Sequence, residues 1–455
     1  MKQAVILAAG KGEKMWPYTS IRNKSNLPIA NVPNIVRLVE SLKKHHVDHI
    51  VVVVSDFAPL TKHQLRHFDD VIVICDESTQ GSAESLLASQ PFLVQPIEKL
   101  FVVFGDCVIE SDDLARVIES DTFCALTSTL KETSSAYITV DAKEGLIQKF
   151  KGHHRGGDES VIVSALSLPA SIFDYCLVNP KRFDVLKVGV STPLESFLEV
   201  SINDMMSDGL QLHAIASQDP IIKLSKPWHF LLANTLVAKR LCSKIHENTL
   251  GENATIDPTA RIEGFVQLGK NSVIGRGVWI KGNCIIGDDV VIEHYSVLEG
   301  DNIIGDRTTI FNMAKVANGS VIGKDCRLDQ TFEFLGGTMM DHVYAVHLGE
   351  FFGCLGENSD LGAGTICGTL RFDDGQSVHR IKGKKEIPIA YANATYLGDQ
   401  CRTGVGAYLM PGVKIGARSV VGSGVVLSED LEDDAIIFVK QETVIKKWRS
   451  DQYGW

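Results

Sequence analysis

The chain has 455 residues, of which 44% are hydrophobic, and it carries a formal net charge of −11 at pH 7. This length is too great for one hydrophobic core and predicts two or three domains. The acidic balance argues against nucleic acid as a partner, and the lack of a long apolar run argues against a membrane span. The ten cysteines form no CxxC pair. That pattern is typical of reduced thiols in a cytoplasmic protein, not of a zinc site or a disulfide framework.

Residues 1–230 alternate short β-branched runs with amphipathic stretches. Helical spacing predicts a helix over 34–45, and Ser111 is placed to cap a second helix over 112–119, whose acidic first turn suits the helix dipole. The alternation predicts an α/β domain built on a parallel sheet with helices on both faces. Ligands in such sheets bind at the carboxyl ends of the strands. The predicted strands are 4–7, 49–54, 71–75, 100–104, 123–129 and 161–168.

The first predicted strand runs into a loop that contains two glycines, with Lys14 close behind. Glycine removes the side chain where a backbone must approach a phosphate, and lysine adds positive charge. On its own, such a loop is explained about as well by an ordinary tight turn. Three more segments follow at suitable distances and strengthen the phosphate-binding interpretation. The four segments are Leu7-Ala8-Ala9-Gly10-Lys11-Gly12, Asn23-Lys24 and its continuation to 33, Gln80-Gly81-Ser82-Ala83, and Val103-Phe104-Gly105-Asp106.

A helix predicted over 228–246 separates this half from a different pattern, in which every sixth residue from Ile256 to Leu328 is branched and apolar. No α-helix or ordinary strand keeps a period of six. A coil with three flat faces does, because each apolar residue points into a narrow axis and stacks on the coil below. The frame returns from Leu397 to Leu427, broken only by Thr403, and the gap over 371–388 predicts a loop that leaves the coil.

Taken in order, the four segments of the amino-terminal half resemble the sugar-1-phosphate nucleotidylyltransferases, and the six-residue repeats resemble the hexapeptide acyltransferases. Together, over nearly the whole chain, they resemble the archaeal-type bifunctional UDP-N-acetylglucosamine pyrophosphorylase/glucosamine-1-phosphate acetyltransferases. The resemblance implies a Rossmann-like α/β nucleotidyltransferase domain (1–230), a linking helix (231–250), a left-handed parallel β-helix (251–440) and a tail (441–455). It also implies a homotrimer.

The resemblance assigns roles to individual residues. It implies an NTP held by Leu7, Ala8, Ala9, Gly10 and Gly12, with its base read by Gln80, Gly81 and Ser82. Lys14 and Lys24 would act in catalysis, on the leaving pyrophosphate and on the sugar phosphate, and Asp106 would bind Mg²⁺. The reaction is an in-line attack of a sugar 1-phosphate on the α-phosphorus of the NTP. It needs charge neutralisation and alignment more than a base.

The chain departs from the family pattern at Lys223, which stands where the family has an aspartate as its second Mg²⁺ ligand. A lysine cannot ligate Mg²⁺ while it is charged. Lys223 therefore either replaces one positive charge of the metal or abolishes metal binding. Lys14 is a milder departure, since it stands in place of an arginine.

A second candidate site lies among the repeats, where 358–373 resembles the acceptor coil of the acetyltransferases, whose acyl donor is acetyl-CoA. His347 is the candidate base, because a neutral imidazole near pH 7 can accept the proton of an attacking amine. Thr369 replaces the family's active-site asparagine. The two loop lysines of the family fall at Gly375 and Val378 here, but Lys382 lies nearby, so Thr369 and Lys382 are candidates for the acyl-acceptor site. A polar surface histidine and a plain solvated loop are the alternatives.

Two functions from different classes stay open. The leading one is NTP-dependent activation of a sugar 1-phosphate, with acetyl transfer to an amino-sugar phosphate as a second activity. The alternative is a catalytically decayed homologue that keeps the fold for assembly or regulation in a sugar-nucleotide pathway. The glycine loop, Lys24 and Asp106 favour the enzyme, whereas Lys223 favours decay.

Overall fold

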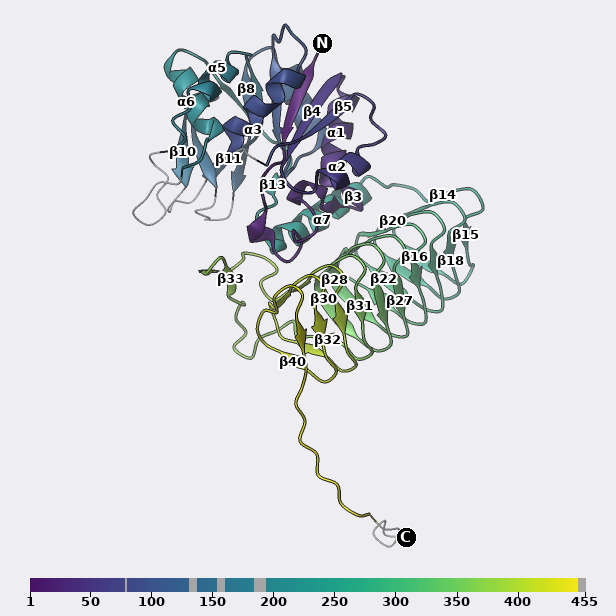
Figure 1. Ribbon diagram of the computed structural model, residues 1–455. Coiled ribbons are helices and arrows are strands. Elements are labelled where there is room, and N and C mark those ends of the chain that lie inside the picture. The colour runs from purple at the N-terminus through teal and green to yellow at the C-terminus, as the bar shows by residue number, and fades with distance from the viewer. Residues whose placement is uncertain (78–79, 131–136, 154–159, 184–193, 449–455) are drawn as a thin grey trace.

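The computed structural model describes residues 1–77, 80–130, 137–153, 160–183 and 194–448. Figure 1 shows an α/β domain at the amino end and a long stack of coils toward the carboxyl end. Helix α7 (Pro227–Cys242) lies between them and ends short of the predicted His246. No helix in the described part of the chain is both long and apolar enough to cross a membrane. The ten cysteines are free thiols, and all but Cys75 are buried.

The α/β domain is built on one nine-stranded sheet in the order β5-β4-β1-β6-β11-β8-β12-β10-β9. Every predicted strand is present, and the first four of this order run parallel. The expectation of a wholly parallel sheet is wrong, because β11 runs antiparallel to β6 and β8, and β9 and β10 form a hairpin. The bounds are β1 Gln3–Leu7, β4 His49–Val54, β5 Val71–Cys75, β6 Leu100–Phe104, β8 Cys124–Leu130, β9 Ile138–Lys143, β10 Leu146–His153, β11 Ser160–Leu168 and β12 His213–Ala216.

The helices follow the predicted apolar spacing. Helix α1 (Asn34–Lys44) buries Ile35, Leu38, Val39 and Leu42 against the sheet. Helix α4 (Ser111–Glu119) is present, but the predicted cap is wrong: Ser111 is its first residue, and Glu110 precedes it without a side-chain cap bond. The Ser111 hydroxyl instead meets Nε2 of His45 at 3.0 Å and ties α4 to the end of α1. The other helices are α2 Ala58–Gln64, α3 Ser82–Ser89, α5 Ile172–Leu177 and α6 Leu198–Ser207.

The six-residue period builds a parallel β-helix from β14 (Thr249–Leu250) to β41 (Ile436–Ile437). Strands pair with the strand one coil away, as Val273 does with Val291, so each coil holds three repeats. The predicted apolar residues from Leu268 to Leu328 are buried in one continuous core. Thr403 keeps its place in the frame because its hydroxyl lies 2.6 Å from that of Thr365 inside the coil. Two faces merge into a sixteen-stranded sheet through β28 (Glu333–Met339), and the third face is a ten-stranded sheet.

The predicted loop over 371–388 leaves the coil and carries an antiparallel hairpin of β33 (His379–Ile381) and β34 (Lys384–Glu386). Figure 1 shows this hairpin projecting from the β-helix below the α/β domain. The coil continues across the excursion, because β35 (Thr395–Leu397) pairs in parallel with β30 (Glu350–Leu355).

A shared core joins the two domains next to the glycine loop. Tyr18 packs against Phe230 of α7 with ring centroids 5.4 Å apart, and its hydroxyl donates to the carbonyl oxygen of Cys354 in the β-helix at 3.0 Å. Arg22 is buried and forms an ion pair of 2.8 Å with buried Asp399. The segment that follows the glycine loop is therefore fixed on the β-helix.

Candidate active site

A cavity of about 530 Å³ opens at the carboxyl ends of β1 and β6. These strands are adjacent and parallel, with Leu7 opposite Phe104, so they deliver the glycine loop and Asp106 to the same edge of the sheet. The start of α3 borders the same space. The cavity brings together these residues predicted from the sequence: Leu7, Ala8, Ala9, Gly10, Lys24, Gln80, Gly81, Ser82 and Asp106.

The glycines around this cavity differ in what they allow. A Cβ on Gly81 would lie 2.4 Å from the carbonyl oxygen of Ser196, so the close passage of the chain alone demands glycine there. A Cβ on Gly12, whose φ is +71°, would lie 2.7 Å from Cγ of Lys24. A Cβ on Gly10 would meet nothing closer than 3.9 Å, the distance to the end of the Lys24 side chain. Gly10 thus leaves backbone accessible from the cavity, as phosphate binding to N–H groups requires.

Lys223 lies beside Asp106, because β13 (Ile222–Lys223) pairs with β7 (Cys107–Val108) and puts Lys223 opposite Cys107. On the other side of the carboxylate, Nζ of Lys24 lies 2.5 Å from Oδ2 of Asp106. Burial acts to raise the pKa of Asp106, but the charges of Lys223 and Lys24 outweigh it and lower the pKa to about 2. Burial likewise acts to lower the pKa of Lys223, and Asp106 reverses this and raises it. The cluster is thus one carboxylate held between two ammonium groups.

This donor set does not fit a Mg²⁺ ion held by the protein. Mg²⁺ takes oxygen ligands and uses one or two carboxylates beside water and phosphate oxygens. In the part of the chain that the structure describes, no group of three or more His, Cys, Asp or Glu side chains could hold a metal. Asp106 is already shared by Lys24 and Lys223, whose fixed charges repel a cation.

A second lobe of about 430 Å³ continues from the first, and Lys11, Lys24, Asp106 and Lys223 line both. Lys14 lies here, and burial, followed by the nearby charge of Lys226, lowers its pKa. Among the described residues, five lysines and three carboxylates line this second lobe. An acidic protein thus has a locally positive cavity, which favours a polyanionic ligand.

Glu199 was not among the predicted residues, and it also lines the first lobe. Burial raises its pKa, and within the described part of the chain its Oε2 has no hydrogen-bond partner. Its position depends on the packing of α6 against α3, where the backbone N–H of Leu198 donates to the hydroxyl of Ser82 at 2.9 Å. No motif in the sequence marks such a contact, so Glu199 could not be predicted from the sequence.

The β-helix candidates are arranged differently. His347 follows β29 (Tyr344–Val346) on an exposed coil corner, where its Nδ1 contacts Oε1 of Gln330 one coil away. Thr369 is half-buried after β32 (Ile366–Cys367). Neither lines the two lobes described above. Lys382 lies at the tip of the β33–β34 hairpin, forms an ion pair with Glu13 and lines the second lobe, so the structure places this acyl-acceptor candidate at the α/β domain.

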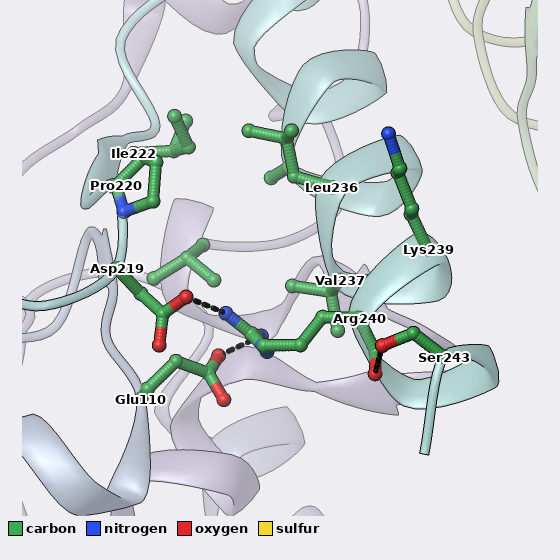
Figure 2. A pocket seen from close by; sticks show the side chains of 11 residues that line it. Glu110, Asp219, Pro220, Ile222, Leu236, Val237, Lys239, Arg240 and Ser243 are labelled. Atoms are coloured by element: carbon green, nitrogen blue, oxygen red, sulfur yellow. Dashed lines mark hydrogen bonds and ion pairs between the residues drawn. The ribbon is translucent and has the colours of Figure 1, made fainter. Parts of the chain in front are cut away.

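Figure 2 shows a smaller cavity of about 260 Å³ between α7 and residues 219–222. Arg240 reaches across it to Glu110 and to Asp219, the latter at 3.6 Å. Arg37 joins the same Glu110 at 3.3 Å. These opposite charges pair with one another and fasten α7 to the α/β domain, and none of the residues predicted to be functional lines this cavity.

Family models match three parts of the chain. The "MobA-like NTP transferase domain" matches residues 4–156, the "GMPPB C-terminal domain" matches 245–343, and the "Bacterial transferase hexapeptide (six repeats)" matches 394–429. Together with the observed strand pairing, they confirm the predicted fold class, a Rossmann-like nucleotidyltransferase domain followed by a left-handed β-helix of hexapeptide repeats.

Curated relatives match along the whole chain. A "Bifunctional protein GlmU" of Methanococcus maripaludis is 31% identical over 458 residues, covering 98% of this chain and 100% of that protein. The one of Methanococcus aeolicus is 28% identical over 457 residues, with 98% and 99% covered. A "Bifunctional sugar-1-phosphate nucleotidylyltransferase/acetyltransferase" of Sulfurisphaera tokodaii is 23% identical over 437 residues, with 94% and 98% covered. The match therefore extends over both domains.

Proposed function

The chain belongs to the family of bifunctional sugar-1-phosphate nucleotidylyltransferase/acetyltransferases that includes the archaeal GlmU proteins, and from this premise we propose that its α/β domain joins an NTP to a sugar 1-phosphate. The products are an NDP-sugar and pyrophosphate. One observation carries the proposal: Gly10, Lys24, Gln80 and Asp106 come from separate segments and line one cavity. The positive second lobe suits the triphosphate.

In the proposed reaction, a phosphate oxygen of the sugar 1-phosphate attacks the α-phosphorus of the NTP. The new P–O bond forms as the bond from the α-phosphorus to the bridging oxygen breaks, and pyrophosphate leaves with that electron pair. Backbone N–H groups near Gly10 bind phosphate, Lys24 and Lys223 neutralise charge on the phosphoryl group in transfer, and Lys14 meets the leaving pyrophosphate. Fixed charges of this kind stabilise a transition state without having to reorganise.

The family implies a metal ion and acetyl-CoA as its usual cofactors. For this chain we propose that the charges of Lys24 and Lys223, held at Asp106, stand in place of a metal ion bound by the protein. Glu199 has an unpartnered carboxylate oxygen within the described residues and accepts a hydrogen bond from a hydroxyl of the ligand.

A second activity is proposed for the β-helix: transfer of an acetyl group from acetyl-CoA to an amino-sugar phosphate. The match of the hexapeptide transferase model to 394–429 favours it. A neutral His347 whose Nδ1–H donates to Gln330 leaves Nε2 to accept a proton from an amine. Because His347 lies on an exposed corner, a second copy in a homotrimer would complete the site.

The deciding experiment measures pyrophosphate release from UTP, ATP, CTP and GTP, each with several sugar 1-phosphates, with Mg²⁺ and with a chelator. We expect release with at least one pair, and its loss in Lys24→Ala. Lys239→Ala is the matched control, because Lys239 is exposed on α7 and lies outside both lobes. No binding of any NTP and no release with any pair would favour the decayed homologue.

A further inference from the structure

The excursion from the β-helix is a regular hairpin with a fixed shape. Ile381 pairs with Lys384, which leaves Lys382 and Gly383 as a two-residue turn. Their φ values are +48° and +78°. A two-residue turn with both φ values positive matches the twist of the strands it joins and is a favoured hairpin turn. The turn places Lys382 at the tip of the hairpin.

The base of the hairpin is anchored on the α/β domain. The buried ring of His379 lies 5.1 Å from that of Trp228 at the start of α7, and its Nε2 donates to the carbonyl oxygen of Ala392 at 2.8 Å. Burial, together with the charge of Lys414, lowers the pKa of His379 to about 4, so the ring is neutral at pH 7. Buried Lys226 forms an ion pair with Glu386 on the other strand. The hairpin thus keeps one position relative to the glycine loop.

Its tip reaches the most positive part of the cavity. Lys382 pairs with Glu13, which follows Gly12 of the glycine loop, and both residues line the second lobe. The charge of Lys384 on the same hairpin contributes to the lowered pKa of Lys14, so it also acts on this lobe. Ammonium groups that converge repel one another unless an anion lies between them. If Lys382 only joined the two domains through Glu13, there would be no reason for four other lysines to line the same lobe.

We propose that Lys382, which the β-helix domain supplies, is a phosphate-binding residue of the nucleotidyltransferase site. When an NTP binds, Lys382 leaves its ion pair with Glu13 and pairs with the pyrophosphate part of the NTP. This inference rests on the proposed function. The pyrophosphate part carries most of the negative charge of an NTP, and the lobe that Lys382 lines holds the most lysines. It follows that the α/β domain does not contain its whole active site.

The test uses the full chain and titrates inorganic pyrophosphate, the NTPs and their monophosphates by calorimetry. Lys382→Ala should weaken pyrophosphate and NTP binding about tenfold, as loss of one charged hydrogen bond does, and leave monophosphate binding unchanged. Lys382→Arg should retain most of the affinity. The matched control is Lys385→Ala, because Lys385 is exposed on the same hairpin and does not line the lobe.

Glu13→Gln separates ligand binding from a structural role. If Lys382 serves only as an interdomain ion pair, Glu13→Gln should weaken binding as much as Lys382→Ala does. The proposal expects the opposite, because Glu13→Gln frees Lys382 for phosphate and should keep or raise the affinity for pyrophosphate. Equal affinities in Lys382→Ala and Lys385→Ala would overturn the inference. Failure of the wild type to bind any NTP would instead overturn the proposed function, while the pyrophosphate titrations would still decide the role of Lys382.

Discussion

In the α/β domain, Gly10, Lys24 and Asp106 lie in separate segments and still line one cavity, whereas in the β-helix His347 lies on an exposed corner and Thr369 is half-buried on another coil. The difference follows from the two folds. Parallel strands collect their carboxyl ends at one edge, so loops far apart in sequence meet there. A β-helix points each side chain either into its axis or out to solvent, so one coil cannot enclose a substrate. A second copy, or an excursion from the coil, must supply the remaining wall.

The largest expected effect comes from filling the cavity at Gly10. Gly10→Ala adds a methyl group that meets no atom closer than 3.9 Å, and its φ lies outside the positive region, so the free energy of unfolding should hardly change. If the backbone there meets phosphate, NTP affinity should fall about a hundredfold, the loss of two charged hydrogen bonds. Calorimetry and thermal unfolding measure the two quantities.

Gly145→Ala in the β9–β10 turn is a control for backbone strain away from the cavity, because φ there is +77° and an added Cβ meets nothing within 4 Å. It should leave NTP affinity unchanged. Gly12→Val is less informative, because the strain at φ +71° and the approach to Lys24 would disturb the loop even without ligand. If Gly10→Ala bound NTP as tightly as the wild type, the glycine loop would be an ordinary turn. The α/β domain would then not differ from the β-helix in enclosing a phosphate-binding site.

The second prediction concerns Lys223. Lys223→Ala removes one of the two charges beside Asp106, so nucleotidyl transfer should slow at least about tenfold, which corresponds to about 1.4 kcal/mol of lost transition-state stabilisation. Lys239→Ala, on the exposed side of α7, should leave the rate unchanged. Lys223→Asp should instead make NTP binding depend on Mg²⁺. Strong wild-type turnover that Lys223→Ala leaves intact would show that this charge is not part of catalysis.

How much of the fold and of the candidate site could be predicted from the sequence depends on how far apart in the chain the interacting residues lie. The period of six predicted the β-helix because inward positions recur locally. Gly10 and Asp106 could be placed together because each lies just beyond the end of a predicted strand, whereas Lys24 was placed beside them by the family resemblance. The pairing of Lys382 with Glu13 could not be predicted, since it depends on the packing of Tyr18 and α7 between the domains. The prediction that Ser111 caps α4 failed because the helix begins one residue earlier, with Glu110 in the cap position and the Ser111 hydroxyl against His45.

The third prediction is a pH dependence that distinguishes a buried site from the surface. The pKa of Asp106 in the folded chain, about 2, lies below its ordinary 3.8, so its ionised form stabilises the fold above pH 4 and this stability is lost as pH falls toward 2. The difference in free energy of unfolding between the wild type and Asp106→Asn should therefore narrow by about 1 kcal/mol from pH 5 to pH 3. Denaturant titrations at the two pH values measure it.

Asp373 is the control for that dependence. Its neighbour Arg371 lowers its pKa, but the pair is exposed on the excursion from the β-helix, where solvent screens such pairs. The difference in free energy of unfolding between the wild type and Asp373→Asn should therefore not change measurably from pH 5 to pH 3. If the free energy of unfolding of Asp373→Asn depended on pH as strongly as that of Asp106→Asn, burial would not explain the behaviour of Asp106.

The smallest effect is expected from His347→Ala. Because His347 is exposed and its ring contacts Gln330 only across the coil surface, the free energy of unfolding should change by less than about 0.5 kcal/mol. Pyrophosphate release should not change either. Acetylation of glucosamine 1-phosphate, followed as thiol release from acetyl-CoA, should be weak in the wild type, because Thr369 replaces the family's asparagine, and absent in His347→Ala.

Light scattering completes this last test, because the proposed base His347 is exposed and the proposal has a second copy complete its site. A homotrimer at micromolar concentration together with acetylation that depends on His347 would support a site shared between copies. A monomer that still acetylates its substrate would place the whole site within one chain. Turnover that survives in His347→Ala would place the base elsewhere on the coil. If neither acetyl-CoA binding nor turnover is found, the β-helix acts as a scaffold, and its contribution to catalysis is the hairpin that carries Lys382 to the other domain.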